Sequence, residues 1–191
     1  MNGYASKKYS EIITFDDDVS GILRTPTCTG CDLDWSCVDT IISKLLFVRN
    51  EILKGGAGLA APQIGFNYPV FIYTPDRTTE NLRVVVNPSM IPLDQTCVDG
   101  SEACFSLPQQ CVKLKRWKKI KVIYQNEKKA WLEDILEGFS AKVFQHEMDH
   151  LEGRLIIDHP NADVKKFNLL EEFEAHMKYV HLEDSKSYLA K

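Results

Sequence analysis

Two histidines four residues apart, with a glutamate directly after the first, constrain this chain more than any other feature. They lie in the stretch 145–150, which reads Gln-His-Glu-Met-Asp-His. On a helix, residues i and i+4 share one face, so His146 and His150 can reach the same divalent metal. Glu147 starts from the same turn and can serve as a general base beside that metal. The alternative is a surface helix rich in histidine and acid, because the pattern is short.

Length, composition and charge limit the other possibilities. The 191 residues fit one domain, 1–191, and hydrophobic and aromatic contents of 44% and 10% suffice for a sizeable core. The net charge of −4 and the pI near 5.7 argue against binding DNA by bulk charge. No apolar run approaches the roughly 18 residues of a membrane span, and the first residues do not resemble a secretory signal. We therefore expect a cytoplasmic protein with no membrane or DNA partner.

Six cysteines occupy positions 28, 31, 37, 97, 104 and 111. A chain without a secretory signal is expected to keep its thiols reduced. Cys28-x-x-Cys31 has the spacing of a metal knuckle, but no second pair of this kind follows. A structural or incidental role is the favoured interpretation of this pair, and a metal or redox site is the alternative.

Helical periodicity of apolar residues occurs in three segments, which are 34–54, 138–152 and 162–180. The first begins at a capping-box-like pair, Ser36 and Asp39, and two glycines end it. The second ends at Gly153, in a C-terminal cap position. The third has one apolar stripe, made up of Val164, Phe167, Leu170, Phe173, Met177 and Val180. We expect the polar residues from 181 onward to fray.

Strand signals are concentrated in the middle of the chain. Residues 68–73 and 82–86 have the composition of strands, and Asn87-Pro88 is expected to end the second. Residues 89–100 are expected to be irregular, with room for one short strand.

The stretch 113–121 carries six basic residues in nine and includes Trp117. Apolar residues with a period of two follow from Ile120. We interpret the stretch as the solvated edge of a sheet that lysines protect, and contact with RNA is the alternative.

The glycine-rich stretch 55–65 follows a helix and lacks the Gly-Lys-Ser/Thr ending of a phosphate loop, which disfavours nucleotide binding. Its small residues let a ligand approach the backbone closely, and Gln63 offers an amide beside it. The alternative is a tight turn with small packing residues. A second notable segment holds Cys104 between Glu102 and Ser106. Its thiol is a soft ligand that would complete a two-histidine set, or else a buried cysteine that packs as a small apolar residue.

Together these segments resemble the peptide deformylase family, whose motifs are, in order, G-x-G-x-A-A-x-Q, E-G-C-x-S and Q-H-E-x-D-H. Residues 56–63 and 145–150 match the first and third motifs in full. Residues 102–106 match the second, except that Ala103 stands where the family has glycine. The resemblance covers roughly residues 24–158.

The resemblance implies an α+β fold. Antiparallel β-sheets would surround a central metal-binding helix, with flanking N-terminal and C-terminal helices. The catalytic core would lie at about 24–158, and the C-terminal helix and tail at 162–191.

The resemblance also implies an activity, which is removal of the N-formyl group from the formylmethionine of newly synthesised polypeptides, with release of formate. Cys104, His146 and His150 would hold one divalent metal, usually Fe(II) in this family, with zinc, nickel or cobalt also possible. Glu147 would transfer the proton. An oxyanion would be held by the Gln63 amide and the backbone N–H of Phe105.

The substrate, a formyl-Met nascent peptide, would lie extended, with the Gly58 carbonyl accepting its amide N–H. Its methionine would enter an apolar pocket walled by Ala57, Phe139 and Val143. The basic stretch 113–121 and the C-terminal helix are candidates for transient ribosome docking. Two rivals stay open at this point: another metallo-amidase or protease with the same helix motif, and a non-catalytic ribosome-binding or peptide-binding relative.

Three positions bear on how far the resemblance extends. If Ala103 required a positive φ, its methyl group would cost about 1 kcal/mol or more. Cys111 stands where some family members have an arginine that aids substrate binding. Arg116 is expected to pair with Glu102 in support of the Cys104 loop, and a plain surface arginine is the alternative.

Overall fold

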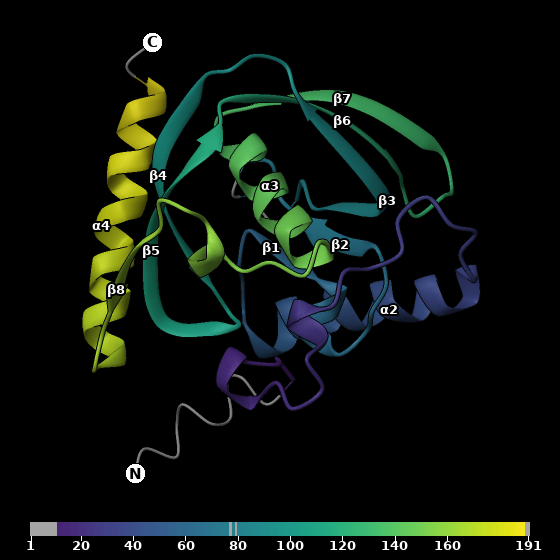
Figure 1. Cartoon of the computed structure of the whole chain (residues 1–191), viewed down its shortest axis with the longest axis horizontal. Coiled ribbons are helices and arrows are strands. Elements are labelled where there is room, and N and C mark those ends of the chain that lie inside the picture. Colours follow the sequence, from purple (N-terminus) through teal and green to yellow (C-terminus); the bar gives the residue numbers. More distant parts are fainter. Residues whose placement is uncertain (1–10, 77, 79, 190–191) are drawn as a thin grey trace.

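Helix α3 lies in the interior of the protein, with two antiparallel β-sheets around it (Figure 1). The computed structural model describes residues 11–76, 78 and 80–189. The five-stranded sheet has the order β1-β2-β3-β6-β7, with strands Gly58–Ala60, Val70–Tyr73, Arg83–Pro92, Lys119–Gln125 and Trp131–Glu137. The three-stranded sheet has the order β4-β5-β8, with strands Cys97–Cys104, Leu107–Trp117 and Asp163–Lys166. The helices are α2 (Trp35–Phe47), α3 (Phe139–Leu151) and α4 (Leu170–Leu189). This is the α+β arrangement that the resemblance implies.

Helix α2 begins at Trp35 because the Asp34 side chain caps it and accepts a hydrogen bond from the Ser36 N–H at 2.9 Å. The predicted cap at Ser36 and Asp39 is therefore wrong, since the Ser36 hydroxyl donates to Asp34 instead. The predicted apolar stripe is buried against β2, and its buried members are Val38, Ile41, Leu45 and Val48. A π-helical turn, Val48–Ile52, then leads toward the two glycines.

The side of α3 that faces the five-stranded sheet is apolar and completes the main core. The Phe144 ring packs edge-on against Phe71 and Tyr73, with ring centroids 5.0 and 5.6 Å away. All three side chains are fully buried, and each such burial stabilises the fold by about 1.5–3 kcal/mol. The packing fixes the position of α3, and the polar side of the same helix is then fixed as well.

Strand β3 continues past the point where the sequence predicts its end. It runs to Pro92 and pairs with β6, with a register shift between Val86 and Ser89. Asn87 has a φ of 52° in this step, which asparagine tolerates better than most residues. Pro88 has no N–H to leave unpaired. The expectation that Asn87-Pro88 ends the strand is wrong because a bulge absorbs both residues.

Residues 89–100, expected to be irregular, are also largely extended. Strand β3 reaches into this segment, and β4 begins at Cys97 and forms a long hairpin with β5. Residues 97–99 are all exposed, so no apolar alternation marks the start of β4 in the sequence.

The basic stretch 113–121 spans two strands. Strand β5 ends at Trp117 and β6 begins at Lys119. Strand β6 lies between β3 and β7, so the interpretation as a sheet edge is wrong for β6. Strand β8 pairs with β5 only at Gln110–Lys113, so residues 114–117 pair with a strand, β4, on one side only. The period of two continues across the break at residue 118, which is why the sequence does not reveal two strands. Lys121 forms an ion pair with Glu133 of β7 at 2.7 Å.

The C-terminal region forms a strand and a helix where the sequence predicts one helix over 162–180. Strand β8 pairs antiparallel with β5, and α4 starts only at Leu170. Pairing along the available edge of β5 outweighs the helical spacing of Val164. The helix then continues to Leu189, so the expectation of fraying from residue 181 is wrong.

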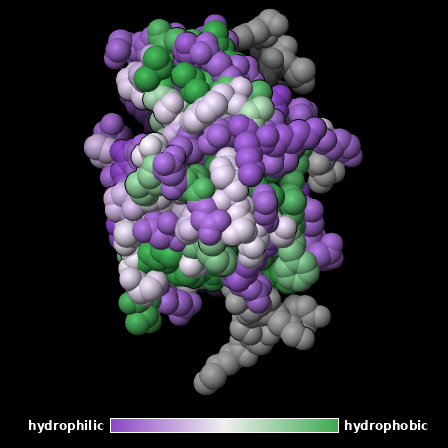
Figure 2. All heavy atoms as spheres, turned by 90° about the vertical axis from the view of Figure 1, so that its right-hand side faces the viewer, coloured by the Kyte–Doolittle hydropathy of each residue, from purple (hydrophilic) through white to green (hydrophobic). Residues whose placement is uncertain are grey.

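The surface seen from the right-hand side of Figure 1 is mostly hydrophilic, with separate hydrophobic areas (Figure 2). Strand β7 contributes three of the exposed large apolar side chains, which are Trp131, Leu132 and Ile135. Within the described residues, no helix combines the length and the apolar character that crossing a membrane would require.

Candidate metal centre and substrate cleft

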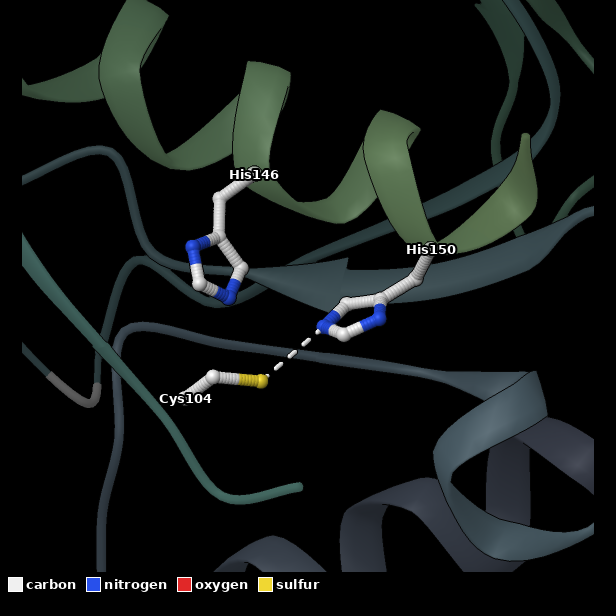
Figure 3. Close-up of side chains that lie close together, drawn as sticks. All are labelled: Cys104, His146 and His150. Atoms are coloured by element: carbon white, nitrogen blue, oxygen red, sulfur yellow. Dashed lines mark hydrogen bonds between the residues drawn. The ribbon is translucent and has the colours of Figure 1, made fainter. Parts of the chain in front are cut away.

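Helix α3 presents both histidines of the motif on one side, and the end of β4 brings Cys104 opposite them (Figure 3). The ring centroids of His146 and His150 are 5.2 Å apart. Cys104 Sγ lies 3.3 Å from His150 Nε2. One donor atom from each of the three residues lies within 4.8 Å of the other two. Cys104 and His150 are 46 positions apart in the sequence, and the fold brings them together with His146.

This donor set fits a divalent metal of the zinc or iron type. A sulfur and an imidazole nitrogen on a tetrahedral metal lie about 3.5 Å apart, close to the 3.3 Å between Cys104 and His150. His146 Nδ1 lies 2.8 Å from Glu102 Oε2, so the carboxylate engages one ring nitrogen and leaves Nε2 for a metal. Three protein donors with an open position are typical of catalytic sites.

The Cys104 thiol lies in surroundings that favour its thiolate form. Burial opposes ionisation, but the charge of His150 and hydrogen bonds with both histidines outweigh it and lower the pKa of Cys104 to about 5. Burial also opposes the charged form of His146, yet hydrogen bonds with Cys104 and Glu102 raise the pKa of His146 well above its ordinary value. The thiolate is the form of cysteine that binds metals.

A buried ion network supports the centre. Arg116 forms a bidentate pair with Glu102, with N–O distances of 2.8 and 2.9 Å, and pairs with Asp149 at 2.7 Å. The Arg116 side chain is 3% exposed, so the predicted pairing with Glu102 is confirmed and the surface alternative is wrong. Burial opposes ionisation of Glu102, but Arg116 and His146 hold its pKa well below the usual range. His159 Nε2 lies 2.7 Å from Asp149 and extends the network.

Glu147 is buried beside the two histidines, and its Oε2 has no hydrogen-bond partner among the described residues. Burial raises the pKa of this carboxyl to about 7, against the opposing charges of His146 and His150. A group with a pKa near neutrality can both accept and return a proton. The carboxylate fits because residue 58 is glycine, since a Cβ at Gly58 would overlap it.

Gln63 is held so that its amide nitrogen points toward Cys104. The residue lies in a 3-10 turn, Ala61–Ile64, and its Oε1 accepts a hydrogen bond from the Ala60 N–H at 2.9 Å. Its Nε2 donates toward Ser106 Oγ at 3.2 Å and lies 3.5 Å from Cys104 Sγ. The structure therefore brings the amide that the sequence singles out to the edge of the donor set.

One cavity of about 520 Å³ opens onto these groups. It is lined by Gln63, Cys104, His146 and Glu147. It is also lined by every residue that the resemblance assigns to substrate and oxyanion binding, namely Ala57, Gly58, Phe105, Phe139 and Val143. Strand β1, which contributes Gly58, is at the edge of its sheet. An edge strand has unpaired backbone groups with which an extended peptide can pair.

Sequence reasoning does not assign two parts of the cavity wall to the site. Arg49 is buried, and its Nε donates to the Gly56 carbonyl at 3.0 Å, which ties the glycine loop to the π-helical turn. Helix α4 contributes Leu170, Phe173 and Met177. The stripe of α4 is visible as a periodic pattern, but the pattern does not specify what the stripe faces.

The two departures from the family motifs are accommodated differently. Ala103 causes no strain of the anticipated kind, because the described non-glycine residues with positive φ are Lys54, Asn87, Gln109 and Lys129. The register of β4 and β5 shifts between Ala103 and Cys104, so a bulge adjusts the strand there. Cys111 is buried in β5 opposite Ala103 and does not line the cavity.

The Cys28-x-x-Cys31 pair lies apart from this centre, before α2. All six cysteines are free, and Cys31 Sγ lies 3.1 Å from the Cys28 carbonyl oxygen. Among the described residues, no second group of three His, Cys, Asp or Glu side chains has its donor atoms as close together as the centre does. The pair is therefore without a third described ligand.

Comparison with known proteins gives a consistent result. Residues 9–166 match the family model described as polypeptide deformylase. The peptide deformylase of Thermotoga petrophila is 44% identical over 103 residues, which cover 54% of this chain and 61% of that protein. The peptide deformylase of Fusobacterium nucleatum is 42% identical over 103 residues, covering 54% and 58%. The chain thus spans about three fifths of the length of these curated relatives.

Solved structures align over more of their length. The peptide deformylase of Thermotoga maritima has a TM-score of 0.67 at 35% identity, over 78% of this chain and 95% of that chain. A probable peptide deformylase from Synechococcus phage S-SSM7 has a TM-score of 0.66 at 32% identity, over 77% and 97%. The fold and the three motif segments therefore point to the same group of enzymes.

Proposed function

The chain belongs to the polypeptide deformylase family, and on this basis we propose that it removes the N-formyl group from the formylmethionine of newly synthesised polypeptides, releasing formate. The main support is the meeting of Cys104, His146 and His150 beside Glu147, with Cys104, His146 and Glu147 lining one cavity. Proteases that share the helix motif take a third ligand from histidine or glutamate, so Cys104 argues against that rival. The buried Glu147 argues against a non-catalytic relative.

The three donors would hold one divalent ion, which we propose to be Fe(II) in vivo, with zinc, nickel or cobalt able to take its place. When bound, such an ion supplies Lewis-acid activation of water and of a carbonyl at neutral pH. Glu102 keeps the His146 ring oriented, and Arg116 keeps Glu102 charged.

We assign proton transfer to Glu147. Its Oε2 would accept a proton as water adds to the formyl carbon, and would return that proton to the nitrogen as the C–N bond breaks. The products are formate and a free amino terminus. The pKa of about 7 and the absence of a described partner for Oε2 both support this role.

The formyl oxygen gains negative charge in this reaction. The Gln63 Nε2 and the backbone N–H of Phe105 would donate hydrogen bonds to it, which stabilises the transition state more than the ground state. Two observations support this role: Gln63 Nε2 lies 3.5 Å from Cys104 Sγ, and both Gln63 and Phe105 line the cavity.

The peptide would lie extended along the outer edge of β1, with its amide N–H donating to the Gly58 carbonyl. The methionine side chain would enter the part of the cavity walled by Ala57, Phe139 and Val143, beside the His146 ring. Apolar side chains with few polar groups suit a thioether side chain.

Nascent chains are the substrate, so we propose that the protein acts in the cytoplasm and meets the ribosome transiently. The candidate surfaces are the basic stretch 113–121 and the C-terminal helix, and the lysines of the stretch can be tested directly. Lys118 and Lys119 lie 3.7 and 3.8 Å from the Glu137 carboxylate, so a ribosomal contact would compete with these pairs. Co-sedimentation of ribosomes with wild type and with Lys118/Lys119/Lys121→Glu, at increasing salt, tests this contact.

The activity itself is tested with protein purified anaerobically and loaded with Fe(II). Formyl-Met-Ala-Ser should release formate, and an internally placed, blocked peptide of the same residues should stay intact. Cleavage of the blocked peptide would favour the protease rival. Release of no formate would refute the proposed function.

Glu147→Ala tests the assigned role of the carboxylate. The variant should keep its metal and lose about 10²–10⁴-fold in kcat/KM. Glu152→Ala, on an exposed glutamate just after α3, is the matched control and should keep wild-type activity. Metal analysis accompanies both assays, and loss of metal from Glu147→Ala would mean that the residue acts as a ligand or support instead.

A further inference from the structure

Helix α4 forms one wall of the cavity and lies beyond the residues that the family model matches. The family match ends at residue 166, and α4 begins at Leu170. The α4 residues at the cavity recur at helical spacing, and they are Leu170, Phe173, Glu174, Met177 and His181. They lie on one face of the helix, and this face borders the cavity from Leu170 to His181.

Contacts with β5 fix the start of α4 at the cavity. The Phe167 N–H donates to the Gln109 carbonyl at 3.0 Å, and Gln109 Nε2 donates to the Phe167 carbonyl at 3.3 Å. The Phe167 ring packs on the Phe173 ring, with centroids 5.7 Å apart. Because Gln109 also lines the cavity, the helix is tied to the wall that follows Cys104 in the chain. Figure 1 shows α4 alongside β4, β5 and β8.

The α4 face has three large apolar side chains. Leu170, Phe173 and Met177 are half-buried and border a cavity to which Phe105 and Pro108 add further apolar surface. In contrast, Tyr179 and Leu182 are each 62% exposed and do not line the cavity. Apolar side chains that are only partly covered at a cavity wall can bury more surface against a ligand.

We propose that Leu170, Phe173 and Met177, the α4 wall, bind the side chains that follow formylmethionine and favour peptides with apolar residues there. The inference rests on the proposed function, which supplies the peptide. The formyl end must reach Cys104 and His146. An extended chain advances about 3.3 Å per residue, so the following residues continue along the remaining walls of the cavity. The specificity wall is thus supplied by a helix beyond the residues that the family model matches.

The test compares formyl-Met-Leu-Phe with formyl-Met-Ala-Ser in four variants. Phe173→Ala and Met177→Ala alter the α4 wall, and Tyr179→Ala and Leu182→Ala are matched controls on the same helix. Wild type should have the higher kcat/KM with the apolar peptide. Phe173→Ala should reduce this ratio about 5- to 20-fold, and Met177→Ala about 3- to 10-fold, because part of an apolar contact is lost. The controls should keep the wild-type ratio.

A binding measurement separates this inference from the proposed function. Calorimetry with the unformylated peptides Met-Leu-Phe and Met-Ala-Ser should show the same loss of preference in Phe173→Ala. If wild type releases no formate from either peptide, the proposed function fails, and the binding preference alone decides about the α4 wall. If formate is released but the α4-wall variants and the controls have equal ratios, the α4 wall is refuted and the activity stands. If Phe173→Ala is unfolded at the assay temperature, the peptide preference of Met177→Ala decides whether the α4 wall binds the peptide.

Discussion

Helices α3 and α4 border the same cavity but are held in the protein in opposite ways. Most of α3 is buried, with a fully buried Phe144 on one side and the ion network around Asp149 on another. On α4, Val180 is the one buried residue among the side chains described. Groups that transfer protons or hold a metal need fixed positions, and enclosure provides them. A wall that only offers apolar surface tolerates a looser attachment.

The contrast between the two helices can be tested first by removing the charge of Arg116, which supports α3. Arg116→Met should lower the free energy of unfolding by about 3–5 kcal/mol, because Glu102 is left buried without its guanidinium partner and Asp149 loses the nearer of its two arginines. Metal affinity should fall about 10- to 100-fold as the His146 ring loses its oriented partner. Lys115→Met, at an exposed neighbour on the same strand, should change the unfolding free energy by at most about 0.5 kcal/mol. Urea unfolding and metal titration measure both effects. Equal losses in the two variants would show that the network contributes nothing specific.

Lowering the pH tests the contribution of the same ion network to stability. Burial opposes ionisation of Glu102 and Asp149, but Arg116 and hydrogen bonds lower the pKa of both carboxyls in the folded protein. Their contribution to stability is complete above the unfolded pKa of about 4, and it is lost as the pH falls through the lowered folded values. Wild type should therefore lose stability below about pH 4, and Arg116→Met should lose less over the same range. The urea midpoints of wild type and Arg116→Met at pH 6 and pH 3 measure this effect. A difference in midpoint between the two proteins that is as large at pH 3 as at pH 6 would contradict the prediction.

A matched pair of phenylalanines measures how differently the two helices are anchored. Phe144→Ala should destabilise the protein by about 3–5 kcal/mol, because the ring is fully buried among Phe71 and Tyr73. Phe173→Ala should cost about 1 kcal/mol, because its ring is only half-buried. Thermal and urea unfolding give both values. Equal costs would mean that α4 belongs to the core.

The role of each helix also determines how much of the site can be predicted from the sequence. Catalytic chemistry needs particular residue types at a fixed local spacing, so His146, Glu147 and His150 are recognisable without a structure. Gln63 and Cys104 each stand in a short motif of their own, and the order of the motifs identifies the family. The pairing of Arg116 with Glu102 was anticipated from the family resemblance, and the structure gives its reason, because a buried carboxylate beside a metal ligand needs a cation.

Features that depend on distant pairing were not predictable. Strand β8 forms because β5 offers it an edge, although Val164 fits a helical stripe equally well. The bulge at Asn87 lets β3 continue through a proline, which is a property of two strands together. His159 joins the network around Asp149 from a turn with no motif, and the side on which α4 docks is fixed by Gln109. In each case the deciding contact lies far away in the sequence.

The smallest expected effect comes from a matched pair of alanines inside the two helices. Ala141→Gly should cost about 1–2 kcal/mol, because it adds the loss of a fully buried methyl group to the helix penalty of glycine. Ala175→Gly, at an exposed position of α4, carries only the helix penalty of about 1 kcal/mol.

Amide hydrogen exchange should separate these two alanine variants. Ala175→Gly should speed exchange in α4 about fivefold and leave α3 unchanged, because α4 has few buried contacts and can open on its own. Ala141→Gly should speed exchange throughout the core. If Ala175→Gly lowered protection in α3 to the same extent as in α4, the two helices would unfold as one unit. The α4 wall would then be part of the catalytic core, and its substitution would disturb the metal centre as well as peptide preference.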